Sequence, residues 1–209
     1  AVWAHEYLED FPNQQDTLRY VLTANMPENK DNNFTWKDFQ TKNNSELVGI
    51  LGNFINRVMV LSHKYYEGIV PTKTIEFEEL TEIKYFAKRI GDHLEKYEFR
   101  AALTEYMNLA RLGNQFLQAQ EPWKKGDDPE AVKGIMYTAT QIAAALGQLG
   151  EPFIPFASEK MLTMMNVDKM TWDDLESTDE FAKAGHQLGQ SELIFAKIED
   201  EAIEAQINK

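Results

Sequence analysis

Residues 46–66, ELVGILGNFINRVMVLSHKYY, place apolar side chains at the spacing of one long amphipathic helix. At about 100° per residue, the apolar side consists of Leu47, Leu51, Phe54, Val58, Leu61 and Tyr65. The opposite side consists of Gly49, Asn53, Arg57, Val60 and Lys64. Asn53 and Arg57 are one turn apart, so their side chains project together. The stretch predicts a helix that packs with one face and presents a polar stripe, for which a solvated surface is the ordinary interpretation.

The composition is that of a globular protein without cysteine chemistry. With 43% hydrophobic and 11% aromatic residues, the 209-residue chain can bury a sizeable core. It has no Cys, which excludes disulfides, thiolate metal sites and a cysteine nucleophile. Its four His residues are scattered without the spacing of metal ligands. We therefore expect no metal site in this chain.

The formal net charge of −13 argues against a diffuse basic surface that holds nucleic acid. Any contact with nucleic acid has to be local, through stacking and a few placed donors. No run approaches the ~18 apolar residues of a membrane span, and no signal peptide opens the chain. We expect a soluble, cytoplasmic protein that binds neither membrane nor DNA. The opening AVWAHEYLEDF lacks Met, so we also expect a part of something longer.

Periodicity and breaker residues predict a mainly α fold. The expected helices cover residues 1–11, 16–26, 46–66, 76–94, 99–121, 129–149 and 156–165. A brief strand is expected at residues 34–36, and a strand-like start followed by an acidic helix at 193–209. Residues 166–191 are expected to be rich in loops, with Trp172 as an anchor. The result is a helical bundle preceded by a small α/β unit.

No stretch of the sequence predicts an active site. Neither a GxxxxGK phosphate loop nor a GxGxxG nucleotide motif occurs, and the carboxylate pairs are typical of solvated helix ends. Trp123 is the second notable feature, because it follows Pro122 just after a predicted helix end and precedes Lys124 and Lys125. Such a Trp is either a hydrophobic helix cap or an exposed platform on which an unstacked base can lie.

Several segments resemble one enzyme family. DTLRY at residues 16–20 resembles a segment that follows the second active-site signature of class I aminoacyl-tRNA synthetases. NSELVGILGNFINR at 44–57 and QEPW at 120–123 look like the anticodon-binding helix and the base-stacking tryptophan of methionyl-tRNA synthetases. LIFAKIEDEAIEAQ at 193–206 resembles the closing segment of that family. The resemblance covers essentially the whole chain in the right order.

The resemblance implies a domain organisation and a set of partners. It implies a stem-contact unit at residues 1–45, a helical anticodon-binding bundle at 46–190 and a C-terminal segment at 191–209 that folds back. The expected partners are tRNA(Met) and a catalytic domain upstream on the same chain. ATP, and any zinc, would belong to that domain, so this chain alone is expected to need no cofactor and to be inactive.

The resemblance also implies which residues read the CAU anticodon. The first anticodon base, cytosine, would stack on Trp123, while Asn53 and Arg57 would bind its Watson–Crick edge. Secondary candidates for contact with the anticodon are Asn56, His63, Lys64 and Asn114. The family carries Arg or Asn further along this helix, where this chain has Leu61 and Lys64. For Asn114, in GNQF, a packing hydrogen bond is an equal interpretation.

Arg19 and Tyr20 are expected to brace the stem-contact unit against the catalytic domain and the inner bend of tRNA. Two alternatives to the whole reading stay open. The chain could be the corresponding region of a class I synthetase for valine, isoleucine or leucine. It could also be an acidic helical module for protein interaction, without any role in nucleic-acid binding.

Overall fold

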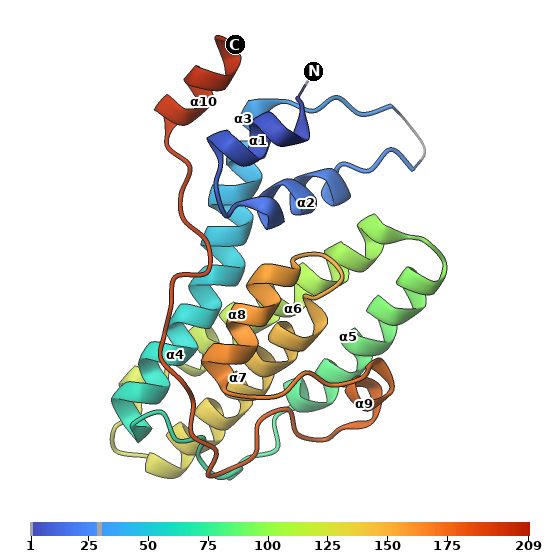
Figure 1. Ribbon diagram of the computed structural model, residues 1–209. Coiled ribbons are helices and arrows are strands. Elements are labelled where there is room, and N and C mark those ends of the chain that lie inside the picture. Colours follow the sequence, from blue (N-terminus) through green and yellow to red (C-terminus); the bar gives the residue numbers. More distant parts are fainter. Residues whose placement is uncertain (1, 29–30) are drawn as a thin grey trace.

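The computed structural model describes residues 2–28 and 31–209, which form a helical protein (Figure 1). Over these ranges the only β pairing is an isolated bridge between Ile69 and Gln187. The N-terminal helices are α1 Ala4–Asp10, α2 Gln15–Ala24 and α3 Trp36–Thr41, followed by the π-helix η1 Lys42–Gly52 and by α4 Asn53–Tyr66. The remaining elements are α5 Glu78–Glu95, α6 Phe99–Gln120, the 3₁₀ turn η2 Pro122–Lys124, α7 Pro129–Leu149, α8 Pro155–Met165, α9 Trp172–Ser177 and α10 Asp200–Ile207.

The expected mainly α fold is confirmed, but the strand predicted at residues 34–36 is wrong. Trp36 begins α3, and the Thr35 hydroxyl accepts a hydrogen bond from the Asp38 backbone N–H at 3.1 Å as a helix cap. Phe34 and Trp36 both pack on the buried ring of Phe39. The aromatic residues that suggested a strand therefore close a helix terminus, and the small N-terminal unit is helical where it is described.

The strand-like start predicted at residue 193 is also wrong, because no neighbouring strand pairs with residues 193–199. Instead of a strand, the side-chain amides of Asn43 and Asn44 in η1 bind this backbone. Asn43 Nδ2 donates to the Ala196 carbonyl at 2.9 Å. Asn44 donates to the Ile198 carbonyl and accepts from the Ile198 N–H, each at 2.9 Å. These bonds satisfy an extended backbone that would otherwise need a partner strand.

The stretch around residues 46–66 lies in one helix that continues without a break from Trp36 to Tyr66, through α3, η1 and α4 (Figure 1). Its predicted apolar side is confirmed over its first turns, with Leu47, Leu51, Phe54 and Val58 fully buried. On the opposite side Asn53 is exposed. The division proposed at residues 45 and 46 falls inside this helix, and its functional meaning stays a prediction.

Helices α5 to α8 form the bundle beside the long helix, and α7 is its centre. Almost every α7 residue after Gly134 is buried, as its Ala-rich sequence predicts. The Ser158 hydroxyl donates to the Gly147 carbonyl at 2.6 Å and so ties α8 to α7. Trp172 anchors α9 on α5, where a Cβ at Gly91 would come within 2.6 Å of its indole nitrogen.

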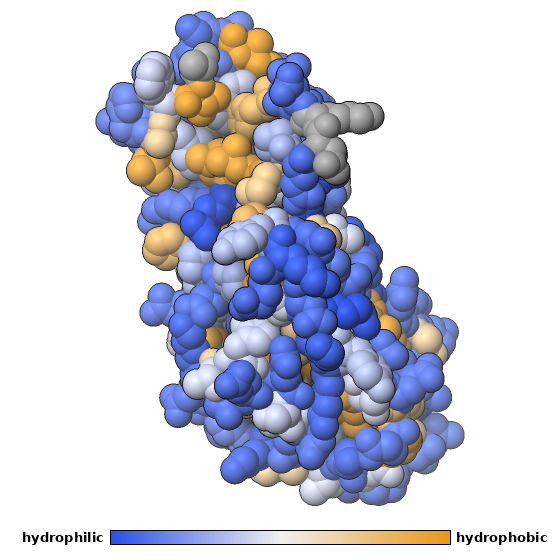
Figure 2. Space-filling model, turned by 90° about the vertical axis from the view of Figure 1, so that its right-hand side faces the viewer, coloured by the Kyte–Doolittle hydropathy of each residue, from blue (hydrophilic) through white to orange (hydrophobic). Residues whose placement is uncertain are grey.

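The C-terminal segment rises along the long helix and ends in α10, so both termini lie at the same end of the molecule (Figure 1). There the Gln206 side chain donates to Asp10 at 3.0 Å, and Lys209 forms an ion pair with Asp10. Apolar residues gather on the surface of this end (Figure 2), where Trp3 is 61% and Ile207 65% exposed. None of the described helices combines the length and apolar character needed to cross a membrane.

Candidate functional site

Side chains from α4, α6 and η2 meet at one place on the surface. Asn114 Oδ1 accepts hydrogen bonds from Asn53 Nδ2 at 3.1 Å and from Arg57 Nη1 at 3.4 Å. The guanidinium carbon of Arg57 lies 5.4 Å from the ring centroid of Trp123, within the range of a cation–π contact. We call Asn53, Arg57, Asn114 and Trp123 the tryptophan cluster. The structure thus brings together the three principal predicted residues and one secondary candidate.

The chain direction after α6 places Trp123 against α4. Glu121 ends the helix in the left-handed region, with φ 44°, and the buried Pro122 begins the 3₁₀ turn. The Lys124 N–H donates to the Glu121 carbonyl at 2.9 Å, and the two side chains form an ion pair at 2.8 Å. Trp123 is left 40% exposed, so part of its indole is available to a ligand.

Gly113 allows α6 and α4 to approach closely enough for the cluster to form. A Cβ at this position would lie 2.5 Å from the ring of Phe54, which is fully buried and has no room to move aside. The next residue, Asn114, is thereby placed against the long helix. Its Nδ2 donates to the Ile50 carbonyl at 3.0 Å and to the Ala110 carbonyl at 3.3 Å.

These bonds determine which way the two amide side chains face. Backbone carbonyls only accept, so Asn114 must turn Nδ2 toward them and Oδ1 toward Asn53 and Arg57. Asn53 consequently donates through Nδ2. Its Oδ1 has no donor among the described residues and stays available as an acceptor. Arg57 likewise has no carboxylate partner in the described chain, so no ion pair neutralises its positive charge.

The other secondary candidates lie outside the tryptophan cluster. Asn56 is exposed and lines a neighbouring hollow of about 380 Å³ between the long helix and residues 191–195. His63 Nε2 donates to the Gly189 carbonyl at 2.9 Å and so holds the C-terminal segment. Lys64 Nζ lies 5.6 Å from the ring centroid of Tyr65. His63, which the sequence suggested as a ligand contact, therefore packs against the C-terminal segment.

Tyr20 is buried, which contradicts its predicted role as an outward contact. It is 2% exposed, and its hydroxyl donates to Glu46 Oε2 at 2.5 Å. Burial, together with this bond to a carboxylate, raises the pKa of the Tyr20 hydroxyl far above its ordinary value. The residue therefore ties α2 to the π-helix as a neutral donor.

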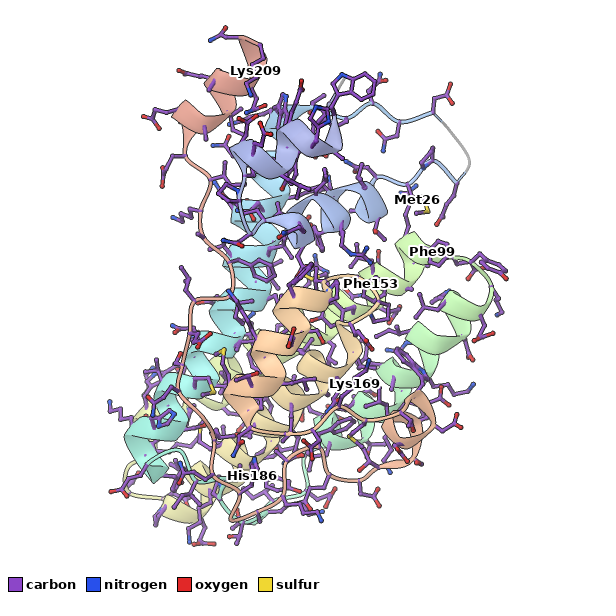
Figure 3. All side chains as sticks on the ribbon, viewed as in Figure 1. Met26, Phe99, Phe153, Lys169, His186 and Lys209 are labelled. Carbon is purple, nitrogen blue, oxygen red and sulfur yellow. The ribbon has the colours of Figure 1, made fainter. Side chains whose placement is uncertain are left out.

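Arg19 also makes its contacts inside the described chain. Its Nε donates to the Phe153 carbonyl at 3.2 Å and its Nη2 to the Pro152 carbonyl at 3.0 Å. Phe153 lies in the turn between α7 and α8 (Figure 3). One turn earlier, Asp16 Oδ2 accepts from the Ala157 N–H at 2.6 Å and so caps the start of α8. We call Asp16, Arg19 and these partners the α2 joint.

Two residues that shape these sites, Gly113 and Asp16, were not predicted from the sequence as site residues. Gly113 stands inside a strongly helical pattern, where an unexplained glycine signals close packing. Asp16 stands one turn before Arg19 on the same helix, so the two opposite charges project together. Both signals were present, but neither one identifies the packing partner.

The sequence matches known protein families over most of its length. Residues 72–209 match the family model described as the anticodon binding domain of methionyl tRNA ligase, and residues 1–59 match the model of class I (M) tRNA synthetases. The chain is 58% identical to a methionine–tRNA ligase of Flavobacterium psychrophilum and 52% identical to one of Cytophaga hutchinsonii. All of the chain is aligned in both, but it spans only 31% of each relative.

The fold is also that of a solved structure. The crystal structure of the apo form of Mycobacterium tuberculosis methionyl-tRNA synthetase superposes with a TM-score of 0.79. The match covers 88% of this chain and 39% of that one, at 19% sequence identity.

Proposed function

Because the chain belongs to the methionyl-tRNA ligase family and contains its anticodon-binding domain, we propose that the tryptophan cluster reads the CAU anticodon of tRNA(Met). The observation that supports this most directly is the cation–π contact of Arg57 with the partly exposed Trp123, beside Asn114, whose Oδ1 accepts from both Arg57 and Asn53. Aromatic surface and unneutralised polar groups in one place are what recognition of an unpaired base requires.

The first anticodon base, cytosine, stacks on the exposed part of Trp123. Its Watson–Crick edge carries one donor, the N4 amino group, and two acceptors, N3 and O2. The free Oδ1 of Asn53 suits the amino group, and the guanidinium of Arg57 suits the two acceptors. In this scheme Asn114 positions both side chains without touching the base.

Uracil in the same place reverses two of these pairings. Its O4 acceptor meets the Asn53 acceptor, and its N3–H donor meets the Arg57 donors. A buried polar group left without a partner costs about 1–3 kcal/mol, which corresponds to a discrimination of about 5- to 150-fold. Stacking on Trp123 adds about 1–3 kcal/mol of affinity that does not depend on the base.

The chain of 209 residues spans 31% of the relative from F. psychrophilum. The remaining functions assigned to the family therefore belong to a larger protein. We infer that this region positions tRNA for an ATP-dependent aminoacylation carried out by the rest of such a ligase, in the cytoplasm. ATP and any zinc are bound outside these residues, and the region itself uses no cofactor. The net charge of −13 supports recognition through a few local contacts.

Binding of fluorescently labelled RNA hairpins, measured by anisotropy, tests the proposal. A hairpin with a CAU loop is expected to bind about 5- to 150-fold more tightly than one with UAU. Trp123→Ala is expected to weaken binding of the CAU hairpin by a similar factor, through the loss of stacking. Trp3→Ala, which removes an exposed tryptophan at the opposite end of the molecule, is the matched control. Equal affinities for the two loops, or an unchanged affinity in Trp123→Ala, would contradict the proposal.

A further inference from the structure

The two long helical segments that supply Asn53, Arg57 and Asn114 to the tryptophan cluster differ in charge from the rest of the chain. Residues 42–66 and α6 together carry five basic residues and two acidic ones, a net charge of +3, in a chain of −13. The basic residues are Lys42, Arg57, Lys64, Arg100 and Arg111, and the acidic ones are Glu46 and Glu105. Both carboxylates are already bound, Glu46 by the Tyr20 hydroxyl and Glu105 by Arg89. The acidity of the protein therefore lies elsewhere.

Three of these cations line one hollow that leads away from the tryptophan cluster. The hollow has a volume of about 200 Å³ and lies between α2, η1 and α6; it is lined by Lys42, Arg100 and Arg111 and by one acidic residue, Glu46. Figure 3 shows Met26, two residues after the end of α2, above Phe99 at the start of α6. Arg111 is one turn before Asn114 on α6, so the hollow begins where the cluster ends.

The two arginines of the hollow keep their positive charge. Arg111 Nη1 donates to Asn108 Oδ1 at 2.9 Å, a neutral acceptor, and the Arg100 side chain has no hydrogen-bond partner among the described residues. By contrast, Arg89 on α5 is paired with Glu105 at 2.9 Å, and Lys42 with Asp38 at 2.6 Å. Glu28 Oε1 accepts a hydrogen bond from the Arg100 backbone N–H at 3.1 Å, and the Arg100 guanidinium makes no ion pair with this carboxylate.

Arg100 and Arg111 also share one face of α6. Eleven residues bring them to within about 20° of each other around the helix, and about 16 Å apart along it. Between them the outward residues are Thr104 and Asn108, which are neutral and can hydrogen-bond. Such a row of planar donors matches the spacing of several phosphates along a nucleic-acid strand.

We propose that Arg100 and Arg111 bind backbone phosphates of the RNA whose base lies on Trp123, so that the anticodon stem runs along α6 toward the end of α2. This inference rests on the proposed function and adds to it a second, sequence-independent contact. Phosphate contacts set the position of the RNA, and base contacts supply the specificity. The row places the contact at one face only, which reconciles RNA binding with a chain that is acidic overall.

The salt dependence of hairpin binding tests the row separately from base reading. In the 209-residue chain, the slope of log K against log salt is expected to fall by about 0.7–0.9 for each arginine, hence by about 1.4–1.8 in Arg100→Gln/Arg111→Gln. The preference for the CAU over the UAU hairpin should be unchanged in this double variant. Trp123→Ala should show the opposite pattern, with an unchanged slope and weaker binding of CAU.

Arg89→Gln is the matched control, because it removes the same charge from an arginine that already has a carboxylate partner. Arg100→Lys/Arg111→Lys should retain the slope, and thermal unfolding followed by circular dichroism should show that every variant is folded. An unchanged slope in the double glutamine variant would overturn the phosphate row. A fall of about 0.7–0.9 in Arg89→Gln, as large as that expected for each arginine of the row, would overturn it too. A lowered slope without any CAU preference would leave the row standing and reject the proposed reading of the anticodon.

Discussion

Arg19 and Arg57 are both helical arginines that the sequence singled out, yet their donors meet different kinds of partner. At the α2 joint, Arg19 donates to two backbone carbonyls, which are fixed by the turn between α7 and α8. At the tryptophan cluster, Arg57 makes a long bond to one amide oxygen and lies over an indole that is 40% exposed. The first arginine has committed donors, and the second has donors that a ligand can use.

The α2 joint and the tryptophan cluster also differ in whether they contain carboxylates. Asp16 at the α2 joint is buried and caps α8, and the Tyr20 hydroxyl beside it is bound by Glu46. The tryptophan cluster contains no carboxylate; its hydrogen bonds run between neutral amides and one guanidinium. The partner of a polar side chain, more than its type or its motif, therefore separates a structural role from a role in binding.

The largest expected effect separates the two arginines directly. Arg57→Ala is expected to weaken binding of the CAU hairpin by about 10- to 150-fold, because a hydrogen bond to a charged group contributes about 1.5–3 kcal/mol. Its free energy of unfolding should change by less than about 0.5 kcal/mol, since the side chain holds little structure. Anisotropy titration and urea denaturation of the same preparation measure both quantities.

Arg19→Ala is the counterpart and should behave in the opposite way, losing stability and keeping the preference for CAU over UAU. A loss of that preference in Arg19→Ala, with stability intact, would show that the α2 joint contacts RNA. The distinction drawn from the partners of the two arginines would then be wrong.

The next effect comes from the glycine that lets α6 approach α4. Gly113→Ala is expected to destabilise the protein by about 1–3 kcal/mol, because the added Cβ would overlap the buried ring of Phe54. Any displacement of α6 also moves Asn114, so the CAU preference should fall together with the stability. Urea denaturation and hairpin titration measure the two effects.

Gly126→Ala is the matched control, since a Cβ there meets nothing within 4 Å. A fully stable Gly113→Ala that still distinguishes CAU from UAU would mean that the close approach of α6 is not needed for the site.

The smallest effect concerns the pH dependence of the α2 joint. Burial, opposed by hydrogen bonds from the Ala157 and Phe156 N–H groups, raises the pKa of Asp16 above its ordinary value. The folded state therefore binds this proton more tightly than the unfolded state. The contribution of Asp16 to stability is largest below the ordinary value of about 3.9 and falls as the pH rises through the raised pKa. Relative to Asp16→Asn, the unsubstituted protein should become less stable as the pH rises above about 3.9.

Asp179→Asn gives the opposite sign as a control. The ion pair with Lys84 lowers the pKa of Asp179, so its contribution is present above the ordinary value and is lost as the pH falls. Urea denaturation across the pH range measures both differences. Equal slopes for the two substitutions would show that the buried carboxyl does not titrate as inferred.

Much of the fold follows from local patterns in the sequence. The start of α7 at Pro129 and its end at Leu149 agree with the predicted bounds, because proline at the first turn and an Ala-rich run are local signals. The strand predictions at residues 34–36 and 193–199 were wrong for the same reason. Aromatic and β-branched residues indicate burial on a surface, but only neighbouring chain segments decide whether that surface belongs to a sheet or to helices.

Some features of the candidate site likewise follow from local sequence, and others depend on packing between distant segments. It follows from the sequence that Asn53 and Arg57 project together and that Trp123 comes after a helix end, because helical geometry relates residues a few positions apart. Packing between distant segments brings Asn114 to this place, binds His63 to the C-terminal segment and buries Tyr20. Helical periodicity tells which face of a helix is covered, but the partner is chosen by packing between segments distant in the chain, and no local pattern encodes that choice.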